Sequence, residues 1–419
     1  MNGQGHPKPK ILVAATLIFM LLLSACAQNS TNNNTTPSQI TGPIKIGVSL
    51  SLTGDNSADG KATRQGYDTW VAYVNSHGGL LGQQVQMTYL DDGSKTDQTR
   101  TNYETLISVD KVNFVLGPFA DDFTVTGAEV AARHGYAFLE GIGTAPGTFK
   151  HGLTDLFAVS LSAEGYLTSF VNYILSLPVS MRPKTVAYAT SDDSFTEPQI
   201  DHARPLLEAG GLQTALYEVY PAENADPVGP AQKVVASHAD IVLIGSLGLQ
   251  DCQAYLKTFI QQKYNPKLIV ATAGPDQGSS FEQAIGKTNT EGLIVPNDGW
   301  WPGVKSFQNS DFVQLITTKY NIGPADISSD SVQAFSVGQV LQQALTKTQS
   351  LDNGKLMQEL RSDTFNSLQG PVKFGADGQN TAAVAYLFQW QKGNLIPVYP
   401  QDHAQANLEY PKPAWASVS

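Results

Sequence analysis

The feature that most constrains the fold is a regular alternation of short apolar runs with stretches of helical periodicity, which begins near Pro43. Apolar runs rich in β-branched and aromatic residues cover residues 44–50, 85–90, 112–116 and 137–140, with helix-period segments between them. This order is typical of a parallel β-sheet with crossover helices. The same alternation restarts at Thr185, with runs at residues 185–189, 216–220, 241–244, 268–271 and 293–295. We therefore expect an α/β protein with two doubly wound parallel-sheet lobes.

The C-terminal part of the chain departs from this alternation. Helical periodicity predicts helices over residues 332–347 and 354–361, and two apolar runs follow at residues 372–374 and 383–390. The turn residues Asp377-Gly378 separate these runs. We expect the two runs to pair as an antiparallel hairpin.

The N-terminus has the pattern of a bacterial lipoprotein signal. Lys8 and Lys10 precede an apolar run over residues 11–23, and the run closes with Leu23-Ser24-Ala25-Cys26, which resembles a lipobox. The run is shorter than the ~20 residues that a bilayer span needs, which disfavours a transmembrane anchor. We expect residues 1–25 to be a signal peptide, Cys26 to carry the lipid, and the polar residues 26–42 to be a flexible tether.

The composition limits the partners and the chemistry. The chain has 26 basic and 37 acidic side chains, a formal charge of −11, which disfavours nucleic acid as a partner. Besides Cys26, the chain has only Cys252, which is either a reactive thiol or a half-buried helix residue. The seven histidines have no metal-ligand spacing, and no nucleophile elbow, phosphate-binding loop or HExxH motif is present. We therefore expect no enzymatic activity, no metal and no cofactor.

Three loops are candidates for a binding site. They follow predicted strands of the first lobe at residues 51–60, 117–123 and 141–146, and they are rich in glycine, aspartate and hydroxyl side chains. Any one of them is explained by turn and cap chemistry. Ligands of open parallel sheets bind at the carboxyl ends of the strands, so three such loops at one sheet edge favour a site.

Several motifs resemble those of the branched-chain amino-acid-type (type I) periplasmic solute-binding proteins of ABC importers, a Leu/Ile/Val-binding-like family. The resemblance extends over about residues 43–400 and implies two lobes joined by three crossover strands, with a small solute clamped between them. It implies an N-terminal lobe of residues 43–160 plus 300–370 and a C-terminal lobe of residues 161–299 plus 371–410. The motifs are Ile44-Lys45-Ile46-Gly47-Val48, Ser51-Leu52-Thr53-Gly54, residues 75–82, Tyr89-Leu90-Asp91-Asp92, Gly117-Pro118, Gly141-Ile142-Gly143-Thr144, Asp192-Asp193-Ser194-Phe195, and residues 291–295, 370–374 and 388–390.

The resemblance also implies ligand-binding residues. After Gly117-Pro118 the family usually has a serine that holds the ligand's carboxylate. Counting without gaps past Phe119 and Ala120, which are also predicted to line the site, places Asp121 at that position. In the second lobe, Phe195 stands where a tyrosine is more usual. The other implied contacts are Ile142 or Gly143, Thr144, Leu247 and Gly248, and Asp276 for an ammonium group.

Asp121 is the departure that bears most on the ligand. Two carboxylates at ~4 Å repel by about 4 kcal/mol at an effective dielectric of 20. Asp121 therefore either caps the following helix, or the ligand is not held as a simple amino acid. Because Asp55, Asp59, Asp122 and Asp276 lie on neighbouring predicted loops, we expect a neutral or amine-bearing ligand.

We expect a monomeric, lipid-anchored extracytoplasmic receptor that delivers a small polar organic solute to an ABC permease in a bacterial membrane. The solute would be an amino acid or a related amine, amide or aromatic compound, bound by hinge closure. Trp300 and Trp301 either wall the cleft or pack the hinge. The alternatives are the sensing lobe of a signalling system, which we would expect to be fused to a transmembrane helix and a cytoplasmic output domain, and an enzyme that uses Asp121 or Asp276.

Overall fold

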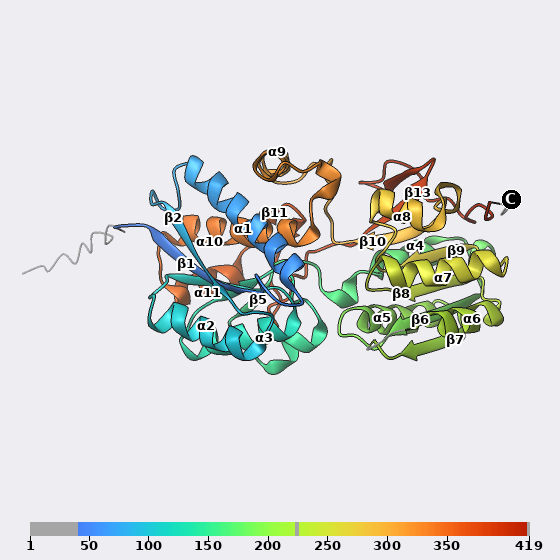
Figure 1. The fold of residues 1–419 in the computed structure, drawn as a ribbon, viewed down its shortest axis with the longest axis horizontal. Coiled ribbons are helices and arrows are strands. Elements are labelled where there is room, and N and C mark those ends of the chain that lie inside the picture. Colours follow the sequence, from blue (N-terminus) through green and yellow to red (C-terminus); the bar gives the residue numbers. More distant parts are fainter. Residues whose placement is uncertain (1–40, 223–225, 417–419) are drawn as a thin grey trace, which may run out of the picture. The chain divides into compact units, whose positions relative to one another are not determined.

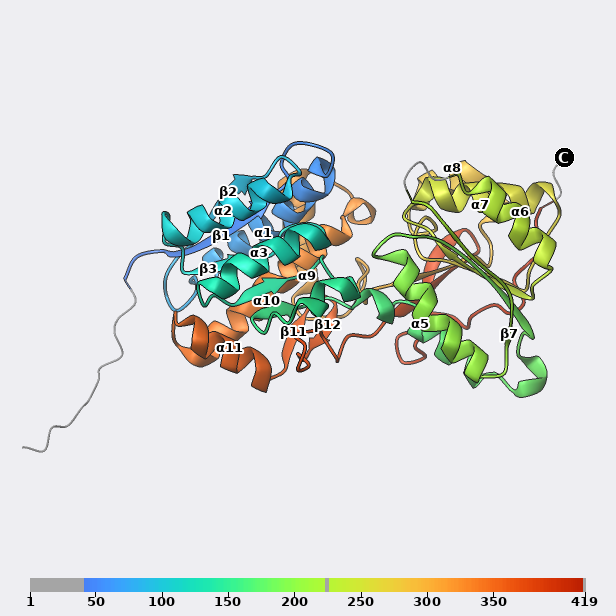
Figure 2. The same ribbon diagram turned by 90° about the horizontal axis from the view of Figure 1, so that it is seen from below.

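A computed structural model describes residues 41–222 and 226–416 of the protein (Figures 1 and 2). The predicted signal peptide, Cys26 and nearly all of the predicted tether lie outside these residues. Within the described part of the chain, no helix combines the length and the apolar character that crossing a membrane requires.

The first sheet has five strands, all parallel, in the order β2-β1-β3-β4-β5. Ile46 in the central strand β1 pairs with Met87 on one side and with Phe114 on the other. Four of these strands agree with the predicted runs, and β5 was not predicted. The strands are β1 (Ile44–Leu50), β2 (Val85–Asp91), β3 (Phe114–Leu116), β4 (Phe138–Glu140) and β5 (Leu156–Ala158).

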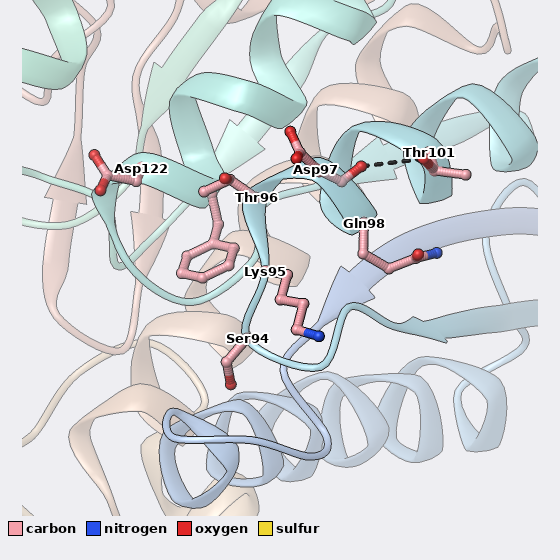
Figure 3. A pocket seen from close by; sticks show the side chains of 8 residues that line it. Ser94, Lys95, Thr96, Asp97, Gln98, Thr101 and Asp122 are labelled. Atoms are coloured by element: carbon pink, nitrogen blue, oxygen red, sulfur yellow. Dashed lines mark hydrogen bonds between the residues drawn. The ribbon is translucent and has the colours of Figure 1, made fainter.

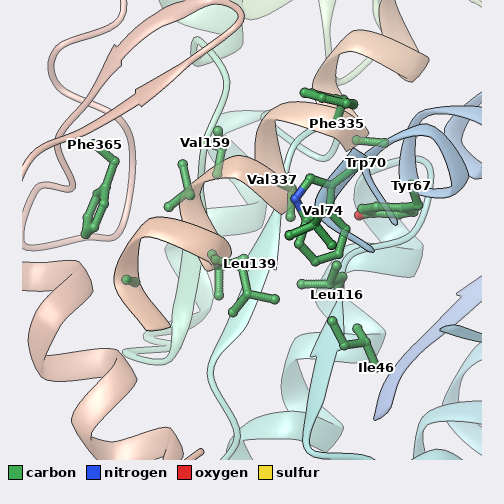
Figure 4. Packing of buried hydrophobic residues seen from close by; sticks show 14 of the residues in the cluster. Ile46, Tyr67, Trp70, Val74, Leu116, Leu139, Val159, Phe335, Val337 and Phe365 are labelled. Atoms are coloured by element: carbon green, nitrogen blue, oxygen red, sulfur yellow. The ribbon is translucent and has the colours of Figure 1, made fainter. Parts of the chain in front are cut away.

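Helices cover both faces of this sheet (Figure 1). One face packs against α1 (Ser57–Ser76), α9 (Asn309–Tyr320), α10 (Ser329–Thr348) and α11 (Asn353–Ser362), and the other packs against α2 (Thr96–Ser108) and α3 (Asp121–Arg133). Trp70 of α1 lies at the centre of the first core, where Figure 4 shows it among aliphatic side chains and Phe335. Gly338 of α10 permits this packing, because a Cβ there would lie 2.2 Å from the Trp70 ring.

The second sheet has seven strands in the order β14-β13-β10-β9-β8-β6-β7. The five neighbouring strands β7, β6, β8, β9 and β10 are parallel to one another. Their side chains alternate between the two faces of the sheet, so that Leu243 and Ile244, for example, belong to different hydrophobic cores. The strands are β6 (Thr185–Ser191), β7 (Gln213–Tyr220), β8 (Ile241–Gly245), β9 (Leu268–Ala271), β10 (Ile294–Asn297), β13 (Tyr386–Gln391) and β14 (Asn394–Tyr399).

The helices of the second sheet also lie on both of its faces. α4 (Thr168–Ser176) and α5 (Thr196–Ala209) cover one face, and α6 (Val228–Ser237), α7 (Leu249–Gln261) and α8 (Gly278–Ile285) cover the other. Cys252 of α7 is fully buried in the second of these cores, so it is more buried than the half-buried position expected. Burial raises the pKa of its thiol, which makes Cys252 a core residue with little thiolate character.

The chain passes between the two sheets three times, after β5, after β10 and after the hairpin of β11 (Phe365–Ser367) and β12 (Gly370–Val372). We call the first sheet with its helices and this hairpin the N-terminal lobe, and the second sheet with its helices the C-terminal lobe. The predicted fold class, two doubly wound α/β lobes with three crossings, is confirmed. The residue at which each lobe ends stays a prediction.

The predicted hairpin between residues 372–374 and 383–390 is wrong. The Asp377-Gly378 turn closes only a single bridge, between Phe374 and Asn380, and the chain then leaves for the other sheet. There β13 pairs antiparallel with both β10 and β14, which gives the second sheet an antiparallel edge. All six residues of β13 are buried, so this strand needs a neighbour on each side. The partner β14 was missed because its Pro397 is typical of edge strands and weakens a strand prediction.

Candidate functional site

The three loops singled out in the sequence meet at one edge of the first sheet. β3 pairs with β1 on one side and with β4 on the other, all parallel, so the carboxyl ends of these strands are adjacent. The strand order reverses between β1 and β3. This is the switch point at which ligands of open α/β sheets bind.

Asp91 and Asp92 anchor the first loop. One Asp91 carboxylate oxygen accepts hydrogen bonds from the backbone N–H groups of Leu52 at 3.0 Å and Thr53 at 3.2 Å. Asp92 accepts from the hydroxyls of Ser49 and Ser51. These acids hold the loop, and their carboxylates are occupied by that role.

Asp121 joins two loops of the N-terminal lobe to the C-terminal lobe. Its Oδ1 accepts from the Ala145 N–H at 2.9 Å and from the Thr148 hydroxyl at 3.1 Å, and its Oδ2 accepts from the Ser194 hydroxyl at 3.1 Å. It is the first residue of α3, where the N-cap residue is Ala120, with a φ of +72°. Both carboxylate oxygens of Asp121 therefore accept hydrogen bonds from other segments. The N-terminus of α3 has no side-chain capping hydrogen bond. Burial raises the pKa of this carboxyl, against the lowering effect of its hydrogen-bond donors.

Glu140, at the end of β4, organises the Gly141–Thr144 segment and was not predicted as a site residue. Its Oε2 accepts from the N–H groups of Ile142 and Gly143, both at 2.7 Å. Its Oε1 is buried without a partner in the described part of the chain, and burial raises its pKa to about 8. Thr144 is buried beside it, and its hydroxyl makes no hydrogen bond with the described residues, so this hydroxyl is available to a ligand.

In the C-terminal lobe, Phe195 is half-buried and packs edge-on against Tyr166, with ring centroids 5.2 Å apart. Asp193 holds this segment by accepting from the N–H groups of Phe195 and Thr196 at 2.9 and 2.8 Å. Tyr166 lies in the first crossing and had no motif that identified it. It places an aromatic face and a hydroxyl next to the predicted Phe195.

The remaining predicted residues of the C-terminal lobe lie on the loops after β8 and β9. Leu247 is exposed and Gly248 is half-buried at the start of α7. Asp276 is exposed, and one of its oxygens accepts from the Gly274 N–H at 2.8 Å. Their contact with a ligand stays a prediction.

The two tryptophans have different surroundings. Trp300 is 7% exposed, packs edge-on against Phe312 in the N-terminal core, and donates its indole N–H to Asn309 at 2.7 Å. It follows the packing alternative. Trp301 is half-buried, with its ring 5.4 Å from those of Tyr386 and Phe388. Its indole N–H is buried without a partner among the described residues.

A buried hydrogen-bond network surrounds Asp298, which follows β10 in the second crossing. Its Oδ2 accepts from the side-chain amides of Gln333 at 2.8 Å and Gln369 at 2.6 Å. Gln369 in turn accepts from the hydroxyl of Ser160 in the first crossing at 3.1 Å. The network ties two crossings to α10 and to the β11-β12 hairpin.

Asp330, in the first turn of α10, is a further acid that the sequence analysis did not select. Burial raises its pKa to about 7, with the charge of Asp59 and then that of Asp298 acting in the same direction. Asp59, which was predicted, is half-buried in the first turn of α1. The sequence signals were weak, since Asp298 stands in a turn-like Asn-Asp-Gly and Asp330 precedes the predicted start of its helix.

Asp122, the next residue of α3, has different surroundings from Asp121. It is exposed and lines a cavity of about 580 Å³ with Phe123 and residues at the start of α2 (Figure 3). A second cavity of about 710 Å³ has walls from both lobes, including Pro146, Glu164 and Ser194. Nowhere in residues 41–222 and 226–416 do three or more His, Cys, Asp or Glu side chains form a group that could hold a metal ion.

Two α/β lobes linked by three crossings, with polar loops at the switch point of the first sheet, define a two-lobed ligand-binding protein. The chain belongs to the periplasmic binding protein family, whose profile matches residues 43–394. This confirms the family that the motifs indicated.

Individual relatives are distant but extend over most of the chain. Leu/Ile/Val-binding protein homolog 7 of Brucella melitensis biotype 1 is 24% identical over 389 residues, covering 88% of this chain and 94% of that protein. A putative branched-chain amino acid ABC transporter from Silicibacter pomeroyi has the same fold, with a TM-score of 0.77 at 18% identity over 88% of this chain and 99% of that one. A branched-chain amino acid transporter substrate-binding protein from Streptococcus pneumoniae, crystallised with isoleucine, has a TM-score of 0.67 at 20% identity over 88% of this chain and 100% of that one.

Proposed function

We propose that this protein is the extracytoplasmic solute receptor of an ABC importer, and that it binds a small polar organic solute between its lobes without transforming it. The solute is an amine or another polar compound, and closure about the three crossings completes its binding site. The closed form then docks on the transmembrane subunits of the importer.

The family match over residues 43–394 is the observation that carries this proposal. The matched region includes the first sheet, all strands of the second sheet except β14, and all three crossings. The related protein from Streptococcus pneumoniae is described as the substrate-binding protein of a transporter and was crystallised with isoleucine. The present chain has polar groups suited to binding, such as the Thr144 hydroxyl, at the switch point where that fold binds ligands.

Isoleucine itself is a poor candidate for the solute of this chain. By the family resemblance, Asp121 takes the position of the carboxylate-binding serine, and both of its oxygens already accept hydrogen bonds from Ala145, Thr148 and Ser194. An ionised Asp121 disfavours an anionic group beside it. The solute therefore lacks a free carboxylate at this position, which agrees with the expectation of a neutral or amine-bearing ligand.

The solute can be identified by native mass spectrometry of the purified chain, followed by a thermal-shift panel of amino acids, amines, amides and carboxylates. A solute at ~100 times its dissociation constant should stabilise the protein by about 2.7 kcal/mol. Each solute that binds is then incubated with the protein and analysed for products. Recovery of an altered solute would contradict the receptor function.

The lipid anchor at Cys26 is the second part of the proposal, and it depends on the Leu-Ser-Ala-Cys pattern. In a bacterial host fed an alkyne fatty acid, the wild-type chain should acquire the label and sediment with membranes. A Cys26→Ser variant should lose both properties. Cys252→Ser is the matched control, because that cysteine is buried in α7, and label that persists in Cys26→Ser contradicts the anchor.

A further inference from the structure

The N-terminal halves of α1 and α10 pack directly against each other. The Ser331 hydroxyl donates to the carbonyl of Ala62 at 2.7 Å. Gly66, one turn further along α1, permits the approach, because a Cβ there would lie 2.2 Å from the carbonyl oxygen of Ser331. Asp59 and Asp330 each stand in the first turn of one of these helices. Their carboxylates are therefore brought to the same end of the helix pair.

Asp298 belongs to the same group. Gln333, one turn after Asp330 on α10, donates to Asp298 at 2.8 Å. Residues three apart on a helix share a face, so Asp298 lies beside the face that carries Asp330. Carboxyl groups from α1, α10 and the second crossing are thus brought to the same end of this helix pair, and the charges of Asp59 and Asp298 act on Asp330.

No cation among the described residues balances these acids. Within the described residues, 41–222 and 226–416, no ion pair includes Asp59, Asp298 or Asp330. Like charges that are partly or fully buried and unpaired cost stability. A charge of opposite sign from a bound molecule would offset that cost.

The carboxylates also keep free acceptors. Both oxygens of Asp59 and the Oδ1 atoms of Asp298 and Asp330 accept no hydrogen bond from any other described residue, since Asp298 and Asp330 accept from other residues only through Oδ2. Four free acceptor oxygens suit a ligand group that carries several N–H donors. They offer nothing specific to a quaternary ammonium, which has none.

Tyr166 provides an independent observation at this place. It is 9% exposed, and its hydroxyl forms no hydrogen bond with the described residues. The charges of Asp298, Asp330 and Asp276, in that order, act on this hydroxyl after burial, and its pKa is raised. The Tyr166 hydroxyl therefore lies close enough to these acids for their charges to act on it, and it has no partner among the described residues that a ligand group would have to displace.

The ligand group is larger than a metal ion. Residues 41–222 and 226–416 contain no group of three acidic, histidine or cysteine side chains close enough to hold one. The three carboxyl groups are therefore spread more widely than a metal's ligands. An ammonium or guanidinium group carries several N–H donors. These donors can reach carboxylates that lie too far apart to bind one metal ion.

We propose that Asp59, Asp298 and Asp330, with the Tyr166 hydroxyl, form a subsite for the protonated amine or guanidinium group of an organic solute. This inference rests on the proposed receptor function and names the class of its solute. It places the cationic group of the solute between α1, α10 and the second crossing, apart from the Asp276 position that the family resemblance implies for an ammonium group.

The test is isothermal titration calorimetry of the purified protein with putrescine, agmatine, choline, 1,4-butanediol, succinate and L-leucine. We expect putrescine or agmatine to bind at least about tenfold more tightly than butanediol, succinate and choline. Asp330→Asn and Asp59→Asn should each weaken that binding at least about tenfold. Asp55→Asn is the matched control, because Asp55 is an exposed acid in the loop just before α1, which carries Asp59, and it should change binding less than about twofold.

Thermal unfolding without solute separates loss of binding from loss of fold. Asp330→Asn removes a buried like charge, so this variant should melt at the same temperature as the wild type or higher, although it binds the amine more weakly. Binding of succinate or leucine but of neither amine overturns the cation subsite and leaves the receptor function intact. Choline that binds as tightly as putrescine also overturns it. If no class of solute in the wider panel binds, both proposals fail.

Discussion

Several carboxyl groups of this protein are buried, and Glu140 is the one whose burial has the clearest consequence for stability. Its pKa is raised to about 8, first by burial, while the N–H groups of Gly143 and Ile142 act in the opposite direction. The folded protein therefore holds a proton on Glu140 at neutral pH. The unfolded chain ionises Glu140 more readily than the folded protein does, so this group lowers the free energy of unfolding. The penalty is small near the pKa of Glu140 in the unfolded chain and grows as the pH rises toward 8.

Replacing Glu140 with glutamine tests this residue. The amide oxygen of Glu140→Gln can accept the same two N–H bonds without any charge, so the variant should be more stable than the wild type. The advantage should increase by about 4 kcal/mol between pH 5 and pH 9, where the wild-type penalty is fully developed. Chemical denaturation at both pH values measures it. Glu282→Gln, whose carboxylate makes no ion pair among the described residues, should show no such trend, and an advantage that shrinks with rising pH contradicts the assignment.

Residues such as Glu140 also show where sequence reasoning about the site stopped. The loops after β1, β3 and β4 could be predicted, because apolar strands followed by Gly-rich segments are visible in the sequence. Glu140 was counted only as the end of a strand, and Tyr166 stands in an irregular segment without a motif. Their importance comes from burial and from missing partners, which depend on elements distant in sequence and cannot be read from local pattern.

Among the secondary-structure elements, the pair α1 and α10 matters most, because it carries Asp59 and Asp330. The helices themselves were predictable from their periodicity, as were the long buried strands. Their close contact was not, because it depends on Gly66 and Gly338 facing Ser331 and Trp70 across 270 residues of intervening fold. The hairpin prediction was wrong for the same reason. The strands that pair with β13 depend on its burial in the second sheet, which the local sequence does not reveal.

We expect Gly66→Ala to destabilise the protein by about 1–3 kcal/mol. The new methyl group would meet the backbone oxygen of Ser331 at 2.2 Å, and backbone cannot move aside as a side chain can. Gly229→Ala in α6 is the matched control, because nothing lies within 4 Å of its Cβ position. It should be neutral or stabilising by up to about 1 kcal/mol, through helix propensity alone. Equal effects of the two variants in urea denaturation would show that the helix contact is looser than described.

At the scale of the whole molecule, the proposed cation subsite is connected to the crossings between the lobes. Asp298 is held by Gln369, just ahead of the third crossing, and Gln369 is held by Ser160 in the first crossing. Asp298 itself stands in the second. A cation that binds Asp298 therefore acts on all three connections at once, which gives solute binding a physical route to closure of the lobes.

The same subsite makes solute affinity depend on pH. Burial, then Asp59 and Asp298, raise the pKa of Asp330 to about 7, and burial also raises the pKa values of Asp59 and Asp298. Tyr166, the other titratable group at the subsite, has a raised pKa and stays neutral throughout this range. A bound cation favours the ionised carboxylates, so binding near neutral pH must expel a proton. Affinity for an amine should therefore increase as the pH rises.

For putrescine, the dissociation constant should fall about tenfold between pH 6 and pH 8, because the ionised fraction of Asp330 rises from roughly a tenth to roughly nine tenths. Calorimetry at pH 6, 7 and 8 measures the trend, and titrations at pH 6 in two buffers of different ionisation enthalpy count the proton released. Asp330→Asn should bind weakly with a smaller pH dependence, while Asp55→Asn should follow the wild type. An affinity that is constant, or that falls as the pH rises, would mean that no carboxylate with a pKa near 7 meets the cation.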